Sequence, residues 1–276
     1  MNHEGLMPPR WHQIDRDGTA LACAEYGGGG TPVILLHGLA GHATEWNETA
    51  SWLTTSHRVF APESRGHGRS ERHPGDVSRN AHVVDVIAWI EHLSLDPVTL
   101  VGQSLGGQTA FLVAARRQDL VEKLVVIEAS PGPCAANGAP VEDDATIRRV
   151  RQWLEGWPKP FPSRDAATAF FGRNDTWAQA WADGLEQHSD GLYPSFDIDV
   201  ILDTLKGATG SFWDEWRAIE CPTLLVVIND RENPDLARQM LAEQPRASLV
   251  EIPDAGHDLH LDNPAAWRET LETFLD

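Results

Sequence analysis

The chain of 276 residues carries 41 acidic and 22 basic side chains, which gives a formal net charge of −19 and an isoelectric point near 4.9. Such an acidic surface repels nucleic acid and anionic membranes, so we expect neither as a partner. No apolar run approaches the roughly 18 residues that a membrane-spanning helix needs. The length suffices for one large α/β domain with an inserted subdomain.

The cysteine pattern argues against both disulfides and structural zinc. Cys23, Cys134 and Cys221 are odd in number, far apart and without a C-x-x-C pair. The first ten residues lack the basic and apolar segments of a secretory signal. We therefore expect a soluble, cytoplasmic protein that needs no metal and no organic cofactor.

The first part of the chain alternates strand and helix patterns. Pro32–Leu36 is a short continuous apolar run, which is typical of a strand buried on both faces of a parallel sheet. Further strands are predicted over residues 20–26, 57–61, 98–102 and 123–127, and helices over 44–53, 77–93 and 108–117. This alternation predicts βαβ units and a mostly parallel sheet.

The pattern breaks between residues 132 and 218, where no strand-like run is visible and aromatic residues are dense. Because this segment is too long for a structureless loop, we predict a helical cap, or lid, at 132–218. The core domain then consists of residues 1–131 and 219–276. Its second part contains predicted strands at 222–228 and 247–252, a helix at 235–243, and a last helix that opens at Asn263-Pro264.

A G-x-S-x-G sequence follows one predicted strand directly and opens a helix. In the segment Gly102-Gln-Ser104-Leu-Gly106-Gly107, small residues on both sides of Ser104 permit a sharp bend that lifts its hydroxyl clear of the backbone. A serine in this position becomes a nucleophile when a histidine can take its proton. Ser104 is thus the candidate nucleophile.

The candidate base is His257, which follows the last predicted strand in Ile252-Pro-Asp-Ala-Gly-His257. Loops at the carboxyl ends of parallel strands converge on one face of the sheet, and Ser104 lies on that face. Another such loop contains His37-Gly38-Leu39. The backbone N–H of Leu39, together with that of Leu105, can form an oxyanion hole beside Ser104.

These motifs, in this order, resemble those of the α/β-hydrolase superfamily. The resemblance covers nearly the whole chain and also includes the Arg65-Gly-His-Gly-Arg-Ser70 turn and Pro222-Thr-Leu-Leu. It implies a mostly parallel, eight-stranded sheet flanked by helices, with the cap as its divergent part. In that family the Arg65–Ser70 turn is chiefly structural, and we assign it no chemistry.

Two carboxylates compete for the third place in the triad. Family members usually carry the acid in a glycine-containing turn after the seventh strand, but here that turn, which includes Asp230, has no glycine and is about one residue short. Glu128, at the end of the preceding core strand, is the preferred acid because its position is similar to that in haloalkane dehalogenases and zearalenone-type lactonases. A carboxylate at a strand end can orient the imidazole. Asp230 stays as the alternative.

The sequence thus predicts a serine hydrolase that cleaves an ester, lactone or amide of a small, fairly apolar substrate through an acyl-enzyme. Carbon–carbon bond hydrolysis and perhydrolysis on the same triad are alternatives, as is a non-hydrolytic receptor or cyclase. The apolar substrate is inferred from cap aromatics, which are equally expected in the core of a small helical cap. The candidates for its pocket are Trp153, Trp177, Trp181 and Trp213.

Overall fold

A central eight-stranded sheet organises the chain. The structure, a computed structural model, describes residues 8–132, 144–172, 174–228 and 234–276. The strand order is β1-β2-β4-β3-β5-β6-β9-β10, and only β1–β2 and β2–β4 pair antiparallel. The strands are β1 (Arg10–Arg16), β2 (Thr19–Gly27), β3 (Pro32–Leu36), β4 (Arg58–Glu63), β5 (Val98–Gln103), β6 (Val121–Ile127), β9 (Thr223–Ile228) and β10 (Ala247–Ile252).

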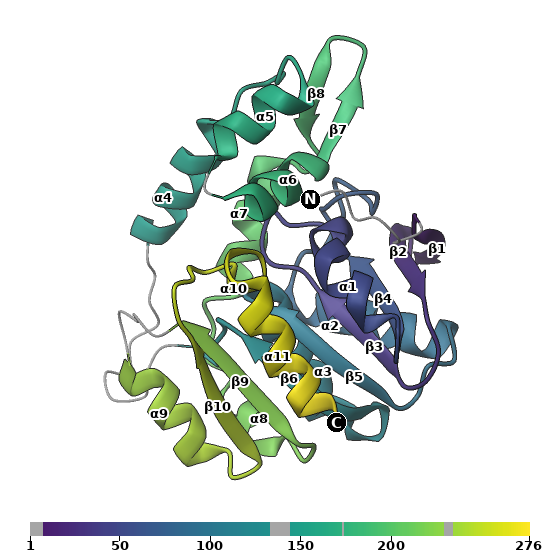
Figure 1. The fold of residues 1–276 in the computed structure, drawn as a ribbon, viewed down its shortest axis with the longest axis vertical. Helices are drawn as coiled ribbons and strands as arrows, with labels where there is room; N and C mark the ends of the chain where they lie inside the picture. The colour runs from purple at the N-terminus through teal and green to yellow at the C-terminus, as the bar shows by residue number, and fades with distance from the viewer. Residues whose placement is uncertain (1–7, 133–143, 173, 229–233) are drawn as a thin grey trace.

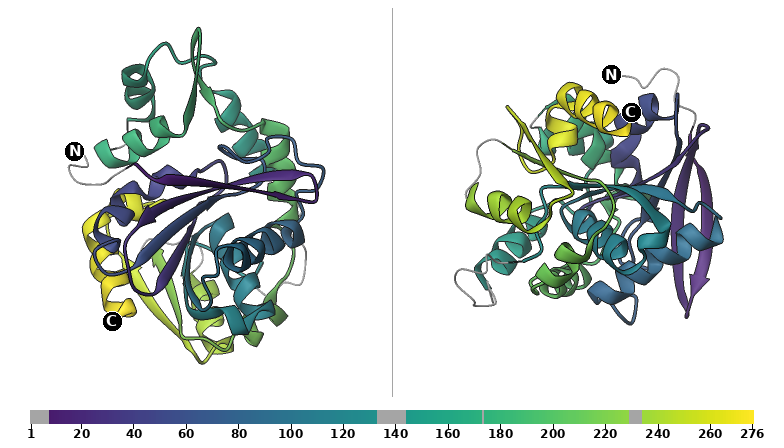
Figure 2. Two further views of the ribbon diagram at one scale, coloured as in Figure 1. Left: turned by 90° about the vertical axis from the view of Figure 1, so that its right-hand side faces the viewer. Right: turned by 90° about the horizontal axis from the view of Figure 1, so that it is seen from below.

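Helices cover both faces of this sheet, as Figures 1 and 2 show. Residues that alternate along β3, β5, β6 and β9 point to opposite sides, and each side has its own apolar cluster. On one side pack α2 (Arg79–His92), α3 (Leu105–Arg116), α8 (Trp213–Ala218) and α9 (Pro234–Glu243). On the other pack α1 (Asn47–Leu53), α10 (Leu259–Asp262) and α11 (Pro264–Leu275).

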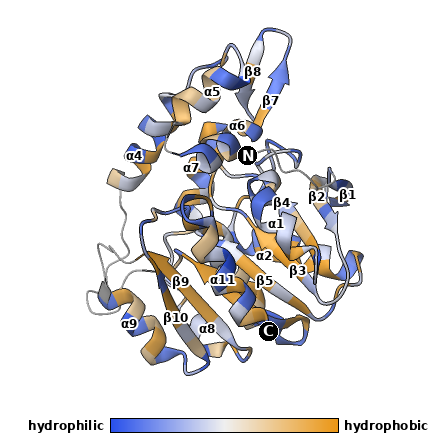
Figure 3. Ribbon diagram, viewed as in Figure 1, coloured by the Kyte–Doolittle hydropathy of each residue, from blue (hydrophilic) through white to orange (hydrophobic). Residues whose placement is uncertain are grey.

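Burial on both faces explains why the central strands read as continuous apolar runs. Every residue of β5 is buried, as are the last four of β3. Figure 3 shows hydrophobic residues along the strands of the sheet and both hydrophobic and hydrophilic residues along the helices. The expectation of a mostly parallel, eight-stranded sheet flanked by helices is therefore confirmed.

The cap segment, defined here as residues 144–207, stands over one end of the sheet (Figure 1; Figure 2, left). It has its own apolar cluster, built around Trp157, Phe161 and Trp181. Its elements are α4 (Asp144–Glu155), α5 (Arg164–Phe171), α6 (Asp175–Asp183), β7 (Leu185–His188), β8 (Gly191–Pro194) and α7 (Ile198–Gly207).

The structure differs from the sequence-based prediction at three places. The segment 132–218 contains a two-stranded hairpin, β7–β8, where no strand was expected. Its last helix, α8, packs against α3 and α9, so it belongs with the core. Strand β1 was not predicted at all, because its sequence is largely polar and it lies at the edge of the sheet with an exposed face.

Candidate active site

Ser104 lies in a strained turn between β5 and α3. Its backbone adopts φ 51° and ψ −114°, a region that residues other than glycine rarely occupy. The turn is fixed by neighbours on both sides, since the Ser104 N–H donates to the Ile127 carbonyl at 2.8 Å and its own carbonyl accepts from the Gln108 N–H at 2.9 Å. The Ser104 side chain makes no capping hydrogen bond to α3. Its hydroxyl is thus free to face the cavity described below.

The glycines of the motif are required by close backbone approach. A Cβ atom at Gly102 would lie 2.3 Å from the Gly106 carbonyl oxygen, and one at Gly106 would lie 2.2 Å from the Leu36 carbonyl oxygen. Both distances are far below van der Waals contact, and the obstacles are backbone atoms that cannot swing away. The G-x-S-x-G pattern is therefore required because the backbones of β3, β5 and α3 pack too closely here for a side chain at either glycine.

Glu128, directly after β6, and His257, in the loop after β10, lie close together. Glu128 Oε2 is 3.7 Å from His257 Nδ1, which is ion-pair range and longer than a hydrogen bond. The other carboxylate oxygen, Oε1, accepts from the Ile228 N–H at 2.9 Å, so the backbone of β9 holds the Glu128 side chain. The Glu128 side chain is 11% exposed and that of His257 57%. Asp230, the alternative acid, lies outside the described residues.

Two buried histidines brace the loop that carries Leu39. His67 Nε2 is 3.1 Å from the Ala40 N–H, and its Nδ1 is 3.0 Å from the Arg65 carbonyl. Since the Ala40 amide can only donate, Nε2 accepts and the proton sits on Nδ1. His37 is bonded in the same way, with Nε2 accepting from the Ser64 N–H at 3.0 Å.

The electrostatics of these two rings agree with this bonding. Burial lowers the pKa of His67 to about 4, and it lowers the pKa of His37 well below its ordinary value. Both rings are therefore neutral near pH 7. The structural role assigned to the Arg65–Ser70 turn thus has a specific content that sequence reasoning missed: His67 anchors the backbone next to Leu39.

One cavity of about 410 Å³ joins the candidate residues. Its lining includes Ser104, His257, Glu128 and both candidate oxyanion-hole residues, Leu39 and Leu105. Leu105 is the first residue of α3, so its N–H has no partner within the helix. The cap contributes Trp153, Trp177 and Trp181 to the same cavity, together with Thr146, Val150 and Leu205.

Trp213, the fourth tryptophan assigned to the pocket from sequence, lies elsewhere. It is 5% exposed and packs in the core cluster on the α3 side of the sheet, with Phe111 and Trp216 among its members. That assignment was wrong because α8 belongs to the core and not to the cap. Gln103 and Asp258, which were not singled out from sequence, do line the cavity.

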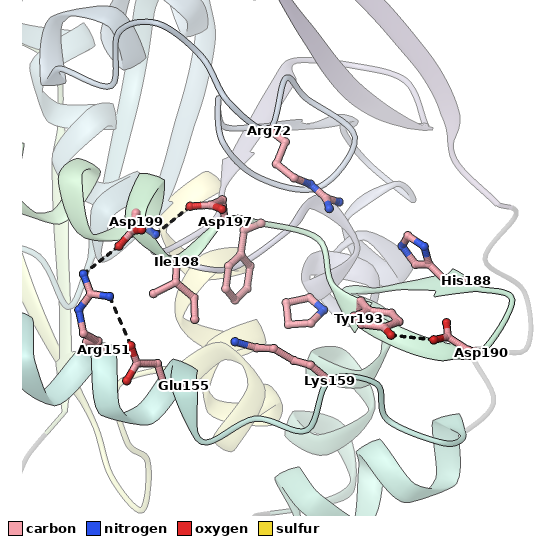
Figure 4. A pocket seen from close by; sticks show the side chains of 12 residues that line it. Arg72, Arg151, Glu155, Lys159, His188, Asp190, Tyr193, Asp197, Ile198 and Asp199 are labelled. Atoms are coloured by element: carbon pink, nitrogen blue, oxygen red, sulfur yellow. Dashed lines mark hydrogen bonds and ion pairs between the residues drawn. The ribbon is translucent and has the colours of Figure 1, made fainter.

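A second cavity, of about 560 Å³, lies on the cap and is strongly charged (Figure 4). Three of its charged side chains pair with one another, for Arg151 contacts both Glu155 and Asp199. The described residues that line it include no serine or cysteine to serve as a nucleophile. The cavity around Ser104 is therefore the candidate active site.

Comparison with known proteins settles the family. Residues 33–270 match the model of the alpha/beta hydrolase family. The chain is a member of that family. The resemblance drawn from the motifs is therefore confirmed. The family and the sequence relatives described next identify this protein as a hydrolase.

Two sequence relatives and one solved structure illustrate the match. A putative esterase/lipase of Haemophilus influenzae is 38% identical, over 89% of this chain and 84% of that protein. The mouse sn-1-specific diacylglycerol lipase ABHD11 is 25% identical, over 98% of this chain and 85% of the relative. The crystal structure of E-2-(acetamidomethylene)succinate hydrolase superposes with a TM-score of 0.84 at 20% identity, over 97% of this chain and 99% of that one, which shows the shared fold.

Two features are absent from the described part of this hydrolase. No helix there is both long and apolar enough to cross a membrane. Within the same residues, no three or more His, Cys, Asp or Glu side chains are grouped so that they could hold a metal ion.

Proposed function

We propose that this hydrolase is a serine esterase or lactonase that works through an acyl-enzyme, with Ser104, His257 and Glu128 as its triad. The observation that carries the proposal is that a strained, partly buried serine, a histidine paired with a carboxylate, and two candidate oxyanion donors line one cavity. This is the arrangement that nucleophilic catalysis on a carbonyl carbon requires.

In the acylation step, Ser104 Oγ attacks the carbonyl carbon while His257 Nε2 accepts the hydroxyl proton. Glu128 faces Nδ1, the other ring nitrogen, and there it favours the tautomer with a proton on Nδ1 and stabilises the imidazolium. The carbonyl oxygen becomes an oxyanion that the N–H groups of Leu39 and Leu105 stabilise. Collapse expels the alcohol, which takes the proton from His257 and leaves Ser104 acylated.

In the deacylation step, water attacks the acyl carbon and gives one proton to His257. The second tetrahedral intermediate collapses to the free acid, and Ser104 Oγ recovers its proton from the imidazolium. The overall reaction consumes one water and needs neither metal nor organic cofactor. An amide substrate follows the same steps with an amine as the leaving group.

The cavity favours a small, largely apolar acyl group. Its cap side consists of three tryptophans together with Val150, Leu205 and Thr146, of which only Thr146 is polar apart from the indole N–H groups, and its volume of about 410 Å³ is within the range of small-molecule sites. The names of the two sequence relatives, an esterase/lipase and a diacylglycerol lipase, agree with an ester of this kind.

Replacement of the nucleophile tests the proposal directly. Ser104→Ala should reduce kcat on p-nitrophenyl esters and lactones by roughly 10⁴–10⁶ with an unchanged thermal unfolding midpoint, because the side chain is removed from a turn and not from the core. A fluorophosphonate should add to Ser104, and peptide mass spectrometry should locate the adduct. More than a tenth of wild-type kcat in the variant, or an adduct elsewhere, would contradict the covalent mechanism.

A further inference from the structure

We infer that the start of cap helix α6 holds residues 256–258, here called the histidine loop, in place. Asn174 and Asp262 are then positioning residues for His257. This inference rests on the proposed function, in which His257 is the base. It gives the cap a share in the chemical step, beyond its contribution to the walls of the pocket.

Asn174 links the two elements with a single side chain. Its Oδ1 accepts from the Trp177 N–H at 2.8 Å and so caps α6, while its Nδ2 donates to Asp262 Oδ1 at 3.1 Å. The other oxygen of Asp262 accepts from the Gly256 N–H at 2.8 Å. The residue immediately before His257 is therefore tied through Asp262 to the first turn of a cap helix.

The residue immediately after His257 is tied to the same helix. Asp258 Oδ2 accepts from the indole N–H of Trp177 at 2.8 Å. On the core side, Gln103 Nε2 donates to the His257 carbonyl at 2.9 Å and lies 3.3 Å from Asp258 Oδ1. The residues on both sides of His257 are thus tied to the cap, Gly256 by its backbone and Asp258 by its side chain, and Gln103 of β5 holds the His257 carbonyl from the core side.

These ties matter because packing encloses the imidazole so little. The His257 side chain is 57% exposed, so the position of its ring depends on the backbone that carries it. A misplacement of about 1 Å between base and nucleophile can reduce a rate by roughly 100-fold. Neither Asn174 nor Asp262 lines the cavity around Ser104, so their effect on the reaction would pass through the histidine loop.

The test breaks the link while it keeps the helix cap. In Asn174→Asp the introduced carboxylate can still accept from the Trp177 N–H, since aspartate and asparagine cap helices equally well. Its second oxygen, however, faces Asp262 Oδ1 and repels it. We expect kcat on a small acetate ester to fall at least ~10-fold with KM changed less than about twofold, and the rate of fluorophosphonate labelling of Ser104 to fall in parallel.

Two further variants separate positioning from general disruption. Ser163→Asp adds the same charge at the N-cap of the preceding cap helix, α5, where the Ser163 hydroxyl accepts from the Ala166 N–H and, among the described residues, forms no hydrogen bond with those around His257. It should leave kcat within about twofold of wild type. In the double variant N174D/D262N, the amide introduced at position 262 can donate to the carboxylate introduced at position 174. One negative charge is added and one removed, so the net charge is unchanged. This variant should recover most of the lost kcat.

Four results would overturn the inference or the proposed function on which it rests. Wild-type kcat in Asn174→Asp, or no recovery in the double variant while all proteins share one unfolding midpoint, would overturn the inference. A loss in Asn174→Asp that only matches the loss in Ser163→Asp would do the same, because it would reflect added charge. If Ser104→Ala stays active, the proposed function falls first, so the two failures can be told apart.

Discussion

At the scale of single residues, the site depends on backbone conformations that cost free energy. Ser104 and Glu128 both have positive φ, 51° and 48°, and both end adjacent parallel strands. Each N–H is held by the next strand along, that of Ser104 by Ile127 and that of Glu128 by Val226 at 3.0 Å. Strain of this kind persists where surrounding structure enforces it, and here the sheet does so.

The identity of the acid is testable by an isosteric change. In Glu128→Gln the amide oxygen can still accept from the Ile228 N–H, which leaves an NH₂ group against His257 Nδ1. That donor favours the wrong imidazole tautomer, so kcat should fall by roughly 10²–10⁴. Steady-state kinetics of both variants measure this loss of kcat, and we expect the loss in Asp230→Asn to be small. The reverse ranking of the two variants would assign the acid to Asp230.

The buried His67 predicts a specific acid sensitivity. Its pKa is about 4 in the folded protein against about 6.5 when unfolded, so the unfolded chain binds the extra proton between these values. This contribution to stability is complete above pH 6.5 and is lost progressively as the pH falls toward 4, by roughly 3 kcal/mol in total. Protonation would also place an N–H against the Ala40 N–H.

Denaturant unfolding from pH 7.5 to 4.5 measures this dependence. His67→Gln keeps an acceptor for the Ala40 amide and cannot titrate, so the free energy of unfolding should fall less steeply below pH 6.5 than in wild type. His37 and His82 have pKa values shifted in the same direction by burial and leave a residual slope. Identical slopes in the two proteins would exclude His67 as a source of the pH dependence.

At the scale of elements, the cap tryptophans divide into a pocket rim and a cap core. Trp153 lines the cavity and is 42% exposed. Trp181 lines the cavity too, but it is 9% exposed and packs edge-on against Trp157 and Trp153. One side chain can therefore be removed at small structural cost, whereas the other supports the cap.

We expect the two tryptophans to differ on truncation. Trp153→Ala should raise KM for p-nitrophenyl octanoate about 10-fold relative to the acetate, because a lost apolar contact is worth about 1–3 kcal/mol. Trp181→Ala should destabilise the protein by roughly 3–5 kcal/mol through the cavity it leaves. Kinetics on both esters and thermal unfolding of both variants would show this. An unchanged octanoate-to-acetate ratio in Trp153→Ala would remove the basis for an apolar acyl group.

At the scale of the whole molecule, charge should influence the choice of substrate. The net charge is −19, and the described residues that line the cavity include Glu128 and Asp258 but no lysine or arginine. An anionic substrate is therefore repelled both on approach and inside the cavity. A neutral substrate meets no such barrier.

A matched pair of esters measures this effect. At low ionic strength, kcat/KM for p-nitrophenyl hemisuccinate should be about 10-fold or more below that for the valerate, which has a similar length. Salt should narrow the difference, since it screens the long-range part, but a residual difference should persist from the partly buried carboxylates. Equal rates at low salt would contradict the electrostatic argument.

Much of the fold could be predicted because its signals are local. The apolar runs of β3 and β5, the Gly102–Gly106 spacing around Ser104, and the placement of His257 after the last strand all depend on neighbours in sequence. The order of strands and helices follows from these patterns, since parallel strands need crossovers of this length. The candidate nucleophile and base could therefore be proposed from the sequence.

What the sequence by itself determined was thus the alternation of core strands and helices along the chain, the family motifs and the candidate nucleophile and base. Tertiary structure decided that Trp213 packs in the core, that His67 holds the loop beside Leu39, and that Asn174 meets Asp262. The last two contacts join residues 27 and 88 positions apart, and Trp213 packs on residues about a hundred positions away. A local pattern carries no information on which distant side chain meets another, because the packing of whole elements fixes that choice.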